Sequence, residues 1–289
     1  MFLRRDMGYN VFMEQQEALQ AKLQQLKLGG SQNLHVVADF DRTLTKVFVE
    51  GKKKPSTIAL LREGKYLAND YATRAHALFD IYYQFEVSPY ITPEEKNQRM
   101  QEWWSTHLAL MMECGMNKEV IQDIIEKKQV VPREGLFEFM DMLTLHNIPF
   151  LIFSAGLGDV IEEFLRSEGK LTPNVYIISN FYEFDEQGKV LGYKSKIIHS
   201  CNKKEIELKG TPYYLLIEKR KNILLLGDSL EDIDMTEGID YDNIIRIGFM
   251  NENTGELDKY AQAFDAVIVE DGPMTFVNEL IKKVVDLTS

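Results

Sequence analysis

Cysteine is scarce in this 289-residue sequence, which contains only Cys114 and Cys201. Two cysteines do not make a disulfide framework or a thiolate zinc site, and they fit a protein of the reducing cytoplasm. Long apolar runs are also missing, because none approaches the roughly 18 residues of a membrane span. No apolar stretch follows the basic residues near the start, so we expect no secretory signal.

Positive charge is in deficit as well. The sequence has 33 Lys and Arg against 45 Asp and Glu, which gives a net charge of −12. Such a surface repels nucleic-acid backbones and anionic membranes, so we expect neither as the main partner. A small anionic substrate is compatible with this charge, because a local lysine or a Mg²⁺ ion can override the global field.

Short, nearly continuous apolar runs are what the sequence does contain, separated by helical patterns such as Gly135–His146 and Asp159–Glu168. Runs of this kind are typical of parallel strands that are buried on both faces. We therefore predict an α/β fold with a doubly wound, Rossmann-like parallel sheet. Residues 11–27 are predicted to form an amphipathic helix that ends before Gly29 and Gly30. The six apolar runs are Leu34–Ala38, Phe150–Phe153, Val175–Ser179, Ile223–Leu226, Ile244–Ile247 and Ala266–Val269.

Residues 56–131 differ from the rest of the sequence, because they contain no comparable strand run and are helical in pattern. We predict that they form a helical cap domain inserted after the first strand, and that residues 1–55 and 132–289 form the α/β core. The expected hinges are residues 51–55 and 131–132. Aromatic residues are concentrated in this interval: Tyr66, Tyr71, Phe79, Tyr82, Tyr83, Phe85, Tyr90, Trp103 and Trp104.

Two carboxylates, Asp39 and Asp41, directly follow the first predicted strand in the segment 39–45 (DFDRTLT). Residues two positions apart at a strand end project to the same side, where like charges repel unless a cation or a proton compensates them. One carboxylate can attack phosphorus and form an aspartyl-phosphate. The other can protonate the leaving alkoxide and then activate water. A merely acidic strand-to-loop transition explains this pattern less well.

A turn and a group of lysines are candidates for binding phosphate. Ser154, with Gly156 and Gly158, follows the second predicted strand, where a hydroxyl and backbone N–H groups suit a phosphate oxygen. These are also ordinary turn residues. A transferring phosphoryl group needs a compact positive charge, but spacing does not choose among four candidate lysines, each of which alone is more often a surface residue. The four are Lys194, Lys196, Lys203 and Lys204.

Acidic residues also follow the fourth predicted strand, in the segment 227–232 (GDSLED). Carboxylates at the end of a buried strand are costly unless they bind a cation. Together with Asp39, they predict an oxygen-rich site for which Mg²⁺ is the natural ion. Asp234 lies close by, and it is equally consistent with a member of this site and with a solvated helix residue.

The order of these motifs resembles the haloacid dehalogenase (HAD) superfamily of phosphohydrolases. An Asp at the second acidic position of the first motif, here Asp41, is typical of the phosphatases in that superfamily. The gap between Asp41 and Ser154 (154 − 41 = 113 positions) leaves room for a cap between the first two motifs. The ordered set is Asp39-x-Asp41-x-Thr43, Ser154, a downstream lysine, and Gly227-Asp228-x-x-x-Asp232.

A closer resemblance covers residue 34 to the C-terminus. It is to the cytosolic 5′-nucleotidase III family, which includes pyrimidine 5′-nucleotidases and 7-methylguanosine-phosphate-specific nucleotidases. It implies a Mg²⁺-dependent 5′-nucleotidase, a phosphoric monoester hydrolase that acts through an aspartyl-phosphate. The segments that carry it are 91–96 (ITPEEK), 102–104 (EWW), 148–163 (IPFLIFSAGLGDVIEE), 179–203 (SNFYEFDEQGKVLGYKSKIIHSCNK) and 222–235 (NILLLGDSLEDIDM).

This resemblance also implies roles for the acidic residues and one lysine. Asp39 matches the nucleophile and a Mg²⁺ ligand. Asp41 matches the general acid and base, and its backbone carbonyl matches a second metal ligand. Asp228 matches the third ligand, Asp232 an acidic residue that supports the metal and the lysine, and Lys203 the catalytic lysine.

The substrate-binding residues follow in the same way. Ser154 and the backbone of Ala155 match the phosphate-binding turn, and Glu86 matches a cap glutamate that faces the nucleoside. His107 stands where a familiar member has Ser, and it is either a contact to the base or a satisfied surface histidine. The cap aromatics are either stacking partners of the base or the core of the cap.

Other departures from the family lie at Arg42, Lys46 and residues 194–196. They leave the catalytic set intact and leave the base open between a pyrimidine and 7-methylguanine. We expect a cytoplasmic enzyme, a monomer or weak homodimer, whose partner is a small-molecule nucleoside monophosphate. Four alternatives share parts of this chemistry: a nucleoside phosphotransferase, a phosphatase for phosphoserine or a sugar phosphate, a non-catalytic binding module and a receiver-type domain phosphorylated on Asp.

Overall fold

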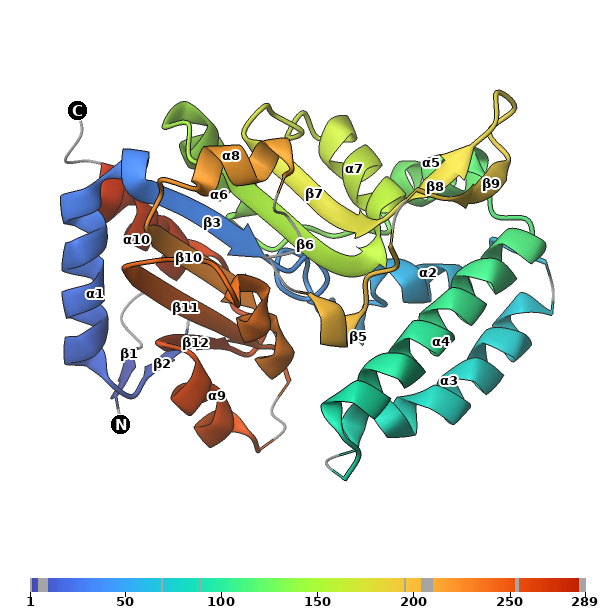
Figure 1. The fold of residues 1–289 in the computed structure, drawn as a ribbon, viewed down its shortest axis with the longest axis horizontal. Coiled ribbons are helices and arrows are strands. Elements are labelled where there is room, and N and C mark those ends of the chain that lie inside the picture. The colour runs from blue at the N-terminus through green and yellow to red at the C-terminus, as the bar shows by residue number, and fades with distance from the viewer. Residues whose placement is uncertain are drawn as a thin grey trace.

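An eight-stranded sheet runs through the computed structural model, in the strand order β1-β2-β12-β11-β10-β3-β6-β7 (Figure 1). Its strands are β1 (Phe2–Arg4), β2 (Val11–Met13), β3 (Leu34–Ala38), β6 (Phe150–Leu157), β7 (Val175–Asn180), β10 (Asn222–Gly227), β11 (Asn243–Met250) and β12 (Ala266–Val269). The structure describes residues 2–4, 10–68, 70–88, 90–194, 196–203, 210–252 and 255–285. Within these ranges, no helix has the length and apolar character needed to cross a membrane.

The six strands from β12 to β7 pair in parallel, and β1 and β2 add an antiparallel edge. All six predicted strands are present, and the α/β class with a mainly parallel sheet is confirmed. β3 and β12 have the predicted bounds, whereas the other four strands are longer than their apolar runs. β3 and β10 are buried along their whole length, which explains why their sequences do not alternate.

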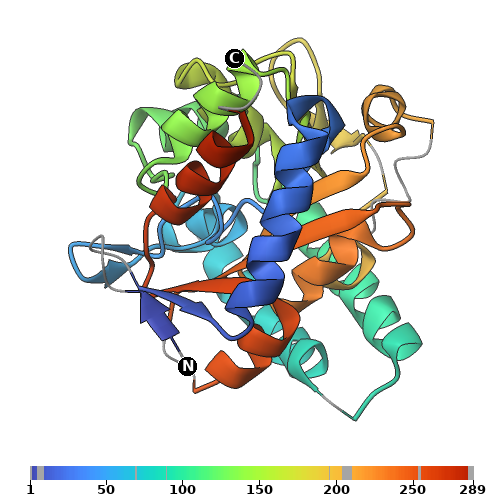
Figure 2. The same cartoon turned by 90° about the vertical axis from the view of Figure 1, so that its left-hand side faces the viewer.

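Helices cover both faces of the sheet. Successive residues of a strand point to opposite faces, so neighbouring apolar residues pack against different helices. On β3, Val36 packs in one cluster with α1, α6, α7 and α10, whereas Val37 packs in another with Tyr213 of α8 and Met235 of η4. Figure 2 looks onto the first of these faces, with α1 in blue lying beside α10 in red. These helices are α1 (Gln16–Gly29), α6 (Leu136–Leu145), α7 (Gly158–Ser167), α8 (Pro212–Ile217), α9 (Leu257–Ala263) and α10 (Thr275–Val285), with short turns η1 (Ser31–Asn33), η2 (Ser200–Asn202) and η4 (Leu230–Thr236).

The N-terminal prediction was wrong at its start. The helix predicted over residues 11–27 begins only at Gln16, and the three residues of β2 pair with the sheet instead. Phe12 lies opposite Val267 of β12, and both side chains are buried in the same cluster. Three consecutive buried residues fit a strand between two covered faces, whereas one face of a helix cannot bury them together.

The interval 56–131 is helical, as predicted. It holds α2 (Thr57–Glu63), α3 (Tyr71–Val87), α4 (Pro93–Glu113) and α5 (Lys118–Glu126), and α3 and α4 project from the sheet as an antiparallel pair (Figure 1). Aromatic side chains join this pair, since the rings of Tyr82 and Trp103 stack with their centroids 6.0 Å apart. The division of the chain into a cap and a core stays a prediction.

Both predicted hinges contain β-type backbone pairing. Lys52–Lys53 forms β5, which pairs with β4 (Phe48–Val49) in a short hairpin. Thr45 forms a bridge to Pro132, so the chain leaves and re-enters the core at neighbouring points. A second hairpin, β8 (Tyr182–Phe184) with β9 (Val190–Tyr193), was also not predicted.

Candidate active site

The first, second and fourth predicted motifs meet at one edge of the sheet. β3 pairs in parallel with β10 on one side and with β6 on the other, so the carboxyl ends of all three strands lie together. Asp39 directly follows β3, Asp228 directly follows β10, and Ser154 lies near the end of β6. The backbone N–H of Asp39 donates to the carbonyl of Leu226 at 3.1 Å, which joins the two loops where they leave the sheet.

Lys203 is the lysine that the fold brings to these carboxylates. Its buried Nζ donates to Oδ1 of Asp39 and, at 3.0 Å, to Oδ1 of Asp232. Burial alone would lower the pKa of Lys203, but the carboxylates of Asp232 and Asp39 raise it above the ordinary lysine value. The amine is therefore held in its charged form. Lys194 instead lies over the ring of Phe181, and Lys204 falls outside the described residues.

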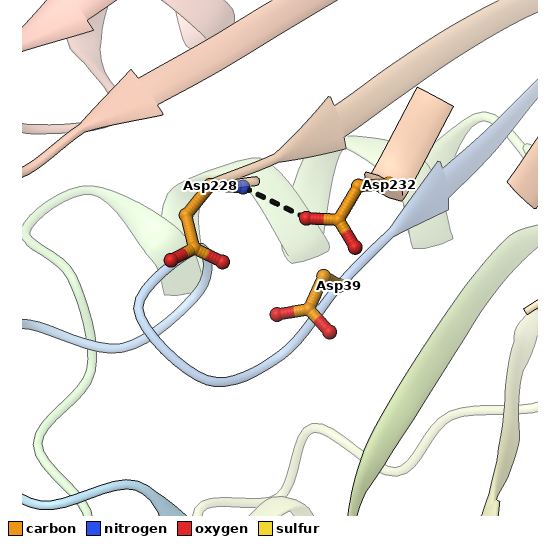
Figure 3. A group of neighbouring side chains, drawn as sticks. All are labelled: Asp39, Asp228 and Asp232. Atoms are coloured by element: carbon orange, nitrogen blue, oxygen red, sulfur yellow. Dashed lines mark hydrogen bonds between the residues drawn. The ribbon is translucent and has the colours of Figure 1, made fainter. Parts of the chain in front are cut away.

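Three carboxylates face one another at this point, as Figure 3 shows. One oxygen each from Asp39, Asp228 and Asp232 lies within 4.8 Å of the others. Burial raises the pKa of Asp228 well above its usual range, and the charges of Asp232 and Asp39 raise it further. Hard oxygen donors in a buried, electrostatically strained group are the donor set that a divalent cation prefers, so these residues fit a metal ion such as Mg²⁺.

Asp232 is held more firmly than its two neighbours. Its Oδ2 accepts hydrogen bonds from the backbone N–H groups of Asp228 at 3.1 Å and Ser229 at 3.0 Å, and its Oδ1 accepts from Lys203. These bonds occupy both of its oxygens. This arrangement suits the supporting role predicted for Asp232, whereas Asp39 and Asp228 are the better candidates for direct ligands.

Asp41 points away from the other carboxylates, toward the start of α2. Its Oδ1 accepts from the backbone N–H of Thr57 at 2.8 Å, and its Oδ2 accepts from the Thr57 hydroxyl at 2.7 Å. Burial raises the pKa of Asp41, and the two bonds from Thr57 oppose that rise. A Cβ at Gly156 would lie within 2.9 Å of Oδ2 of Asp41, so this close approach needs a glycine. The sequence analysis missed Thr57, because its only signal is a position that begins a helix.

The turn that carries Ser154 is fixed by its neighbour β7. The pairing of β6 with β7 shifts register between Phe153 and Leu157, which bends the backbone at the predicted phosphate-binding turn. Asn180 donates to the carbonyl of Ala155 at 2.8 Å. The Ser154 hydroxyl accepts from the backbone N–H of Gly156 at 3.0 Å, which closes the turn. Asn180 was not predicted as part of the site.

A pocket of about 190 Å³ opens at this end of the sheet. Seven of the nine predicted site residues line it, whereas Glu86 and His107 do not. A larger groove of about 470 Å³ lies against α5 and α7, but it contains none of the clustered carboxylates. The lining residues are Asp39, Asp41, Arg42, Ser56, Ile58, Trp104, Ser154, Ala155, Gly156, Lys203, Asp228, Ser229 and Asp232.

Glu86 lies close to this pocket although it does not line it. It stands at the end of α3, and its Oε1 accepts a hydrogen bond from the Ser200 hydroxyl at 3.0 Å. Ser200 belongs to η2, the turn that directly precedes Lys203. Burial raises the pKa of Glu86, and the bond from Ser200 opposes the rise. The end of α3 therefore rests on the segment that supplies the lysine.

His107 is not brought to the pocket. It is 6% exposed, and its Nε2 lies 2.9 Å from the hydroxyl of Tyr71, so it is a buried contact between α4 and α3 rather than a surface histidine. Burial lowers the pKa of His107 to about 4, which keeps the ring neutral. The residue one turn earlier in α4 that does line the pocket is Trp104.

Arg133 supports the site from behind, and the sequence analysis missed it. Its side chain is fully buried and donates to the carbonyls of Thr43 at 2.7 Å and Thr45 at 3.2 Å, and to that of Arg42. It also forms an ion pair with Asp271 at 3.2 Å. The guanidinium of Arg133 thus holds the loop that follows β3. In the sequence, Arg133 was visible only as a charged residue next to a predicted hinge.

The sequence pattern of the pyrimidine 5′-nucleotidase (UMPH-1) family matches residues 42–285. The chain belongs to this family. The predicted enzyme class, a 5′-nucleotidase and hence a phosphoric monoester hydrolase, is confirmed by this membership.

Similar proteins agree with the family assignment. The 7-methylguanosine phosphate-specific 5′-nucleotidase A of Xenopus laevis is 36% identical over 274 residues, which cover 94% of each chain. The crystal structure of cytosolic 5′-nucleotidase IIIB bound to cytidine superimposes with a TM-score of 0.86 at 30% identity, over 96% of this chain and 94% of that one. A HAD-family hydrolase from Salmonella enterica, 17% identical with a TM-score of 0.55 over 86% of this chain and 72% of that one, shares the fold. The predicted HAD-like core of this UMPH-1 family member is confirmed by these likenesses.

Proposed function

We propose that this protein hydrolyses nucleoside 5′-monophosphates of the pyrimidine or 7-methylguanosine type to a nucleoside and inorganic phosphate. The observation that carries the proposal is the meeting of Asp39, Lys203 and Asp228 in one open pocket, since this set combines a nucleophile, a fixed cation and a metal ligand. The names of similar proteins support the substrate class, because one is specific for 7-methylguanosine phosphate and another was crystallised with cytidine.

The carboxylates of Asp39 and Asp228 and the backbone carbonyl of Asp41 would hold a Mg²⁺ ion. When bound, the ion would neutralise the carboxylates and orient an oxygen of the substrate phosphate. Asp232 would hold Lys203 and the loop of Asp228 in place for it, through the hydrogen bonds described above.

Hydrolysis would take place in two steps. Asp39 attacks the phosphorus in line, the P–O5′ bond breaks, and Asp41 gives its proton to the departing 5′-oxygen. Asp41 then takes a proton from water, the water oxygen attacks the aspartyl-phosphate, and phosphate leaves with Asp39 restored. The hydroxyl of Ser154, the backbone at Ala155 and the amine of Lys203 bind the equatorial oxygens throughout.

Residues 56–131 would act as a cap that reads the nucleoside. Glu86 can accept hydrogen bonds from a base or ribose, and Trp104 offers an aromatic face beside the pocket. His107 would influence the choice of base indirectly, by fixing α4 against α3, because its ring is already bonded to Tyr71. The cap division itself rests on the helical content of the interval and on the adjacent crossings at Thr45 and Pro132.

The enzyme would work in the cytoplasm on a small-molecule substrate, as a monomer or weak homodimer, without a nucleic-acid or membrane partner. The net charge of −12 supports the absence of a nucleic-acid or membrane partner, because such a surface repels both. The word cytosolic in the name of the similar crystallised enzyme supports the location.

The test is phosphate release from a panel of monophosphates, each measured with Mg²⁺ and with EDTA. The panel contains CMP, UMP, AMP, GMP, 7-methyl-GMP, phosphoserine and a sugar phosphate. We expect Mg²⁺-dependent release from CMP and UMP or from 7-methyl-GMP, and none from the variant Asp39→Asn, because an amide cannot attack phosphorus. Release from phosphoserine or the sugar phosphate alone would overturn the substrate, and near-wild-type turnover by Asp39→Asn would overturn the mechanism.

A further inference from the structure

Arg42 lines the pocket, although neither the motif pattern nor the mechanism gives it a role. Its backbone has φ 66°, a left-handed conformation that side-chain-bearing residues rarely adopt. Three hydrogen bonds hold it there: its N–H donates to Oγ1 of Thr45 at 2.8 Å, and its carbonyl accepts from Arg133 and, at 2.9 Å, from Asn251. Strained residues that the surrounding structure holds in this way are concentrated at ligand-binding positions.

Arg42 lines the pocket together with Asp228 of the loop after β10 and Trp104 of α4, so three separate segments of the chain meet there. Its positive charge also opposes the rise that burial causes in the pKa of Glu86, at the end of α3. Arg42 is itself exposed, and among the described residues no hydrogen bond or ion pair uses its guanidinium.

The pocket needs this charge when a phosphate enters. Five carboxyl groups lie in or beside it, and a dianionic phosphate adds two further negative charges, against which the proposed mechanism sets only one Mg²⁺ ion and Lys203. Lys203 is already bonded to Asp39 and Asp232, so its charge is shared before any substrate arrives. The guanidinium of Arg42 is not shared in this way, and its planar fork matches two phosphate oxygens. The five carboxyl groups are those of Asp39, Asp41, Glu86, Asp228 and Asp232.

We propose that Arg42 is a substrate-binding residue whose guanidinium pairs with the phosphate oxygens of the bound nucleotide at the mouth of the pocket, on the side of the leaving nucleoside. This inference rests on the proposed function, and it deepens it by adding a second cation for the phosphate. Lys203 then holds the phosphate from within the core and Arg42 holds it from the side of Asp41 and Glu86. Affinity for the charged substrate depends on both.

The kinetic test compares Arg42→Met with Arg42→Lys, using the best substrate of the panel above. For Arg42→Met we expect KM to rise about tenfold, as for the loss of an exposed charge-assisted hydrogen bond, with kcat changed less than about threefold. Arg42→Lys keeps the charge and should retain most of the affinity. The KM of the wild type should also rise more steeply with NaCl than that of Arg42→Met. Arg74→Met, an exposed arginine of α3 that pairs with Glu113, is the matched control and should leave KM unchanged.

A binding experiment separates this inference from the proposed function. Calorimetry would measure the Kd of inorganic phosphate and of an uncharged probe, cytidine or 7-methylguanosine according to the best substrate. We expect Arg42→Met to weaken phosphate binding about tenfold and to leave nucleoside binding and Tm unchanged. An unchanged phosphate Kd and KM, or equal losses for phosphate and nucleoside, would overturn the role of Arg42 while wild-type hydrolysis still supports the nucleotidase. If the wild type hydrolyses no nucleotide but binds phosphate through Arg42, the proposed function fails and the anion site stands.

Discussion

Replacing Arg133 by Met removes the side chain that holds the loop after β3 from behind. Methionine fills much of the same volume but donates no hydrogen bond. The guanidinium also lies over the ring of Phe249, 4.4 Å from its centroid, so part of its packing survives the change. The groups that lose a donor are the carbonyls of Arg42, Thr43, Thr45 and Gly272, the amide oxygen of Asn251 and the carboxylate of Asp271.

The largest part of the lost folding stability comes from Asp271. Its carboxylate is 7% exposed and, among the described residues, would keep as donors the backbone N–H groups of Val47, at 3.0 Å, and Phe48, at 2.9 Å. Breaking a buried ion pair by removing one partner costs about 3–5 kcal/mol. At roughly 2.1 cal/mol/K of unfolding entropy per residue, a chain of this length has about 0.6 kcal/mol/K, so Tm should fall by about 5–8 °C. The kcat should fall by about tenfold or more, because Asp39 and Asp41 sit on the loop that is released.

Calorimetric unfolding measures the stability, and phosphate release measures the activity. Arg166→Met is the control, because this exposed arginine of α7 forms surface ion pairs with Glu162 and Glu163, and losing them should cost less than about 0.5 kcal/mol. Arg133→Lys should fall between wild type and Arg133→Met, since it keeps the ion pair but loses the fork. A Tm and kcat for Arg133→Met that match those of the control would refute the reasoning.

Three further predictions concern single contacts. Thr57→Val should lower kcat about tenfold with little change in KM, because Asp41 loses one of its two hydrogen bonds. Thr57→Ser keeps the hydroxyl and should keep the activity, so equal kcat values for the two variants would contradict this. Gly156→Ala should reduce kcat at least tenfold, because its Cβ would displace the oxygens of Thr57 and Asp41. Steady-state kinetics would measure this, and an unchanged kcat would show that the turn tolerates the methyl group. Burial raises the pKa of Asp159 to about 6 from 3.8, so between these values the unfolded chain releases the proton first and stability falls as the pH rises. Asp159→Asn should remove a decline of roughly 1–3 kcal/mol over that window in urea unfolding, and identical pH profiles for variant and wild type would count against it.

The sheet and the meeting of Asp39 with Asp228 could be predicted, because both depend on local patterns in the sequence. β3 and β10 are buried on both faces and therefore read as unbroken apolar runs, and Asp39 and Asp228 come directly after them. Since parallel strands end at one edge, the meeting of these residues followed from the fold class alone. Lys203 was reached only through the family resemblance, because spacing did not separate it from the other lysines.

What could not be predicted depends on contacts between distant parts of the chain. β2 was assigned to a helix because only its pairing with β12 makes it a strand. Arg133 and Thr57 act through atoms of the loop after β3, and a sequence pattern does not show which backbone carbonyls a side chain will reach. His107 was placed by its position in an aligned stretch, but burial against Tyr71 decides what its ring contacts.

The central position of β3 has a consequence for how the protein is made. Its two neighbours begin at Phe150 and Asn222, and from Ala38 to Asn222 the ribosome must add 184 residues (222 − 38). At about 5–20 residues per second, this takes roughly 10–40 seconds, during which an apolar strand has no partner on one of its edges. The nascent chain thus carries Asp39 long before Lys203 and Asp228 exist, so the candidate site is incomplete until β10 and the loop after it have been made.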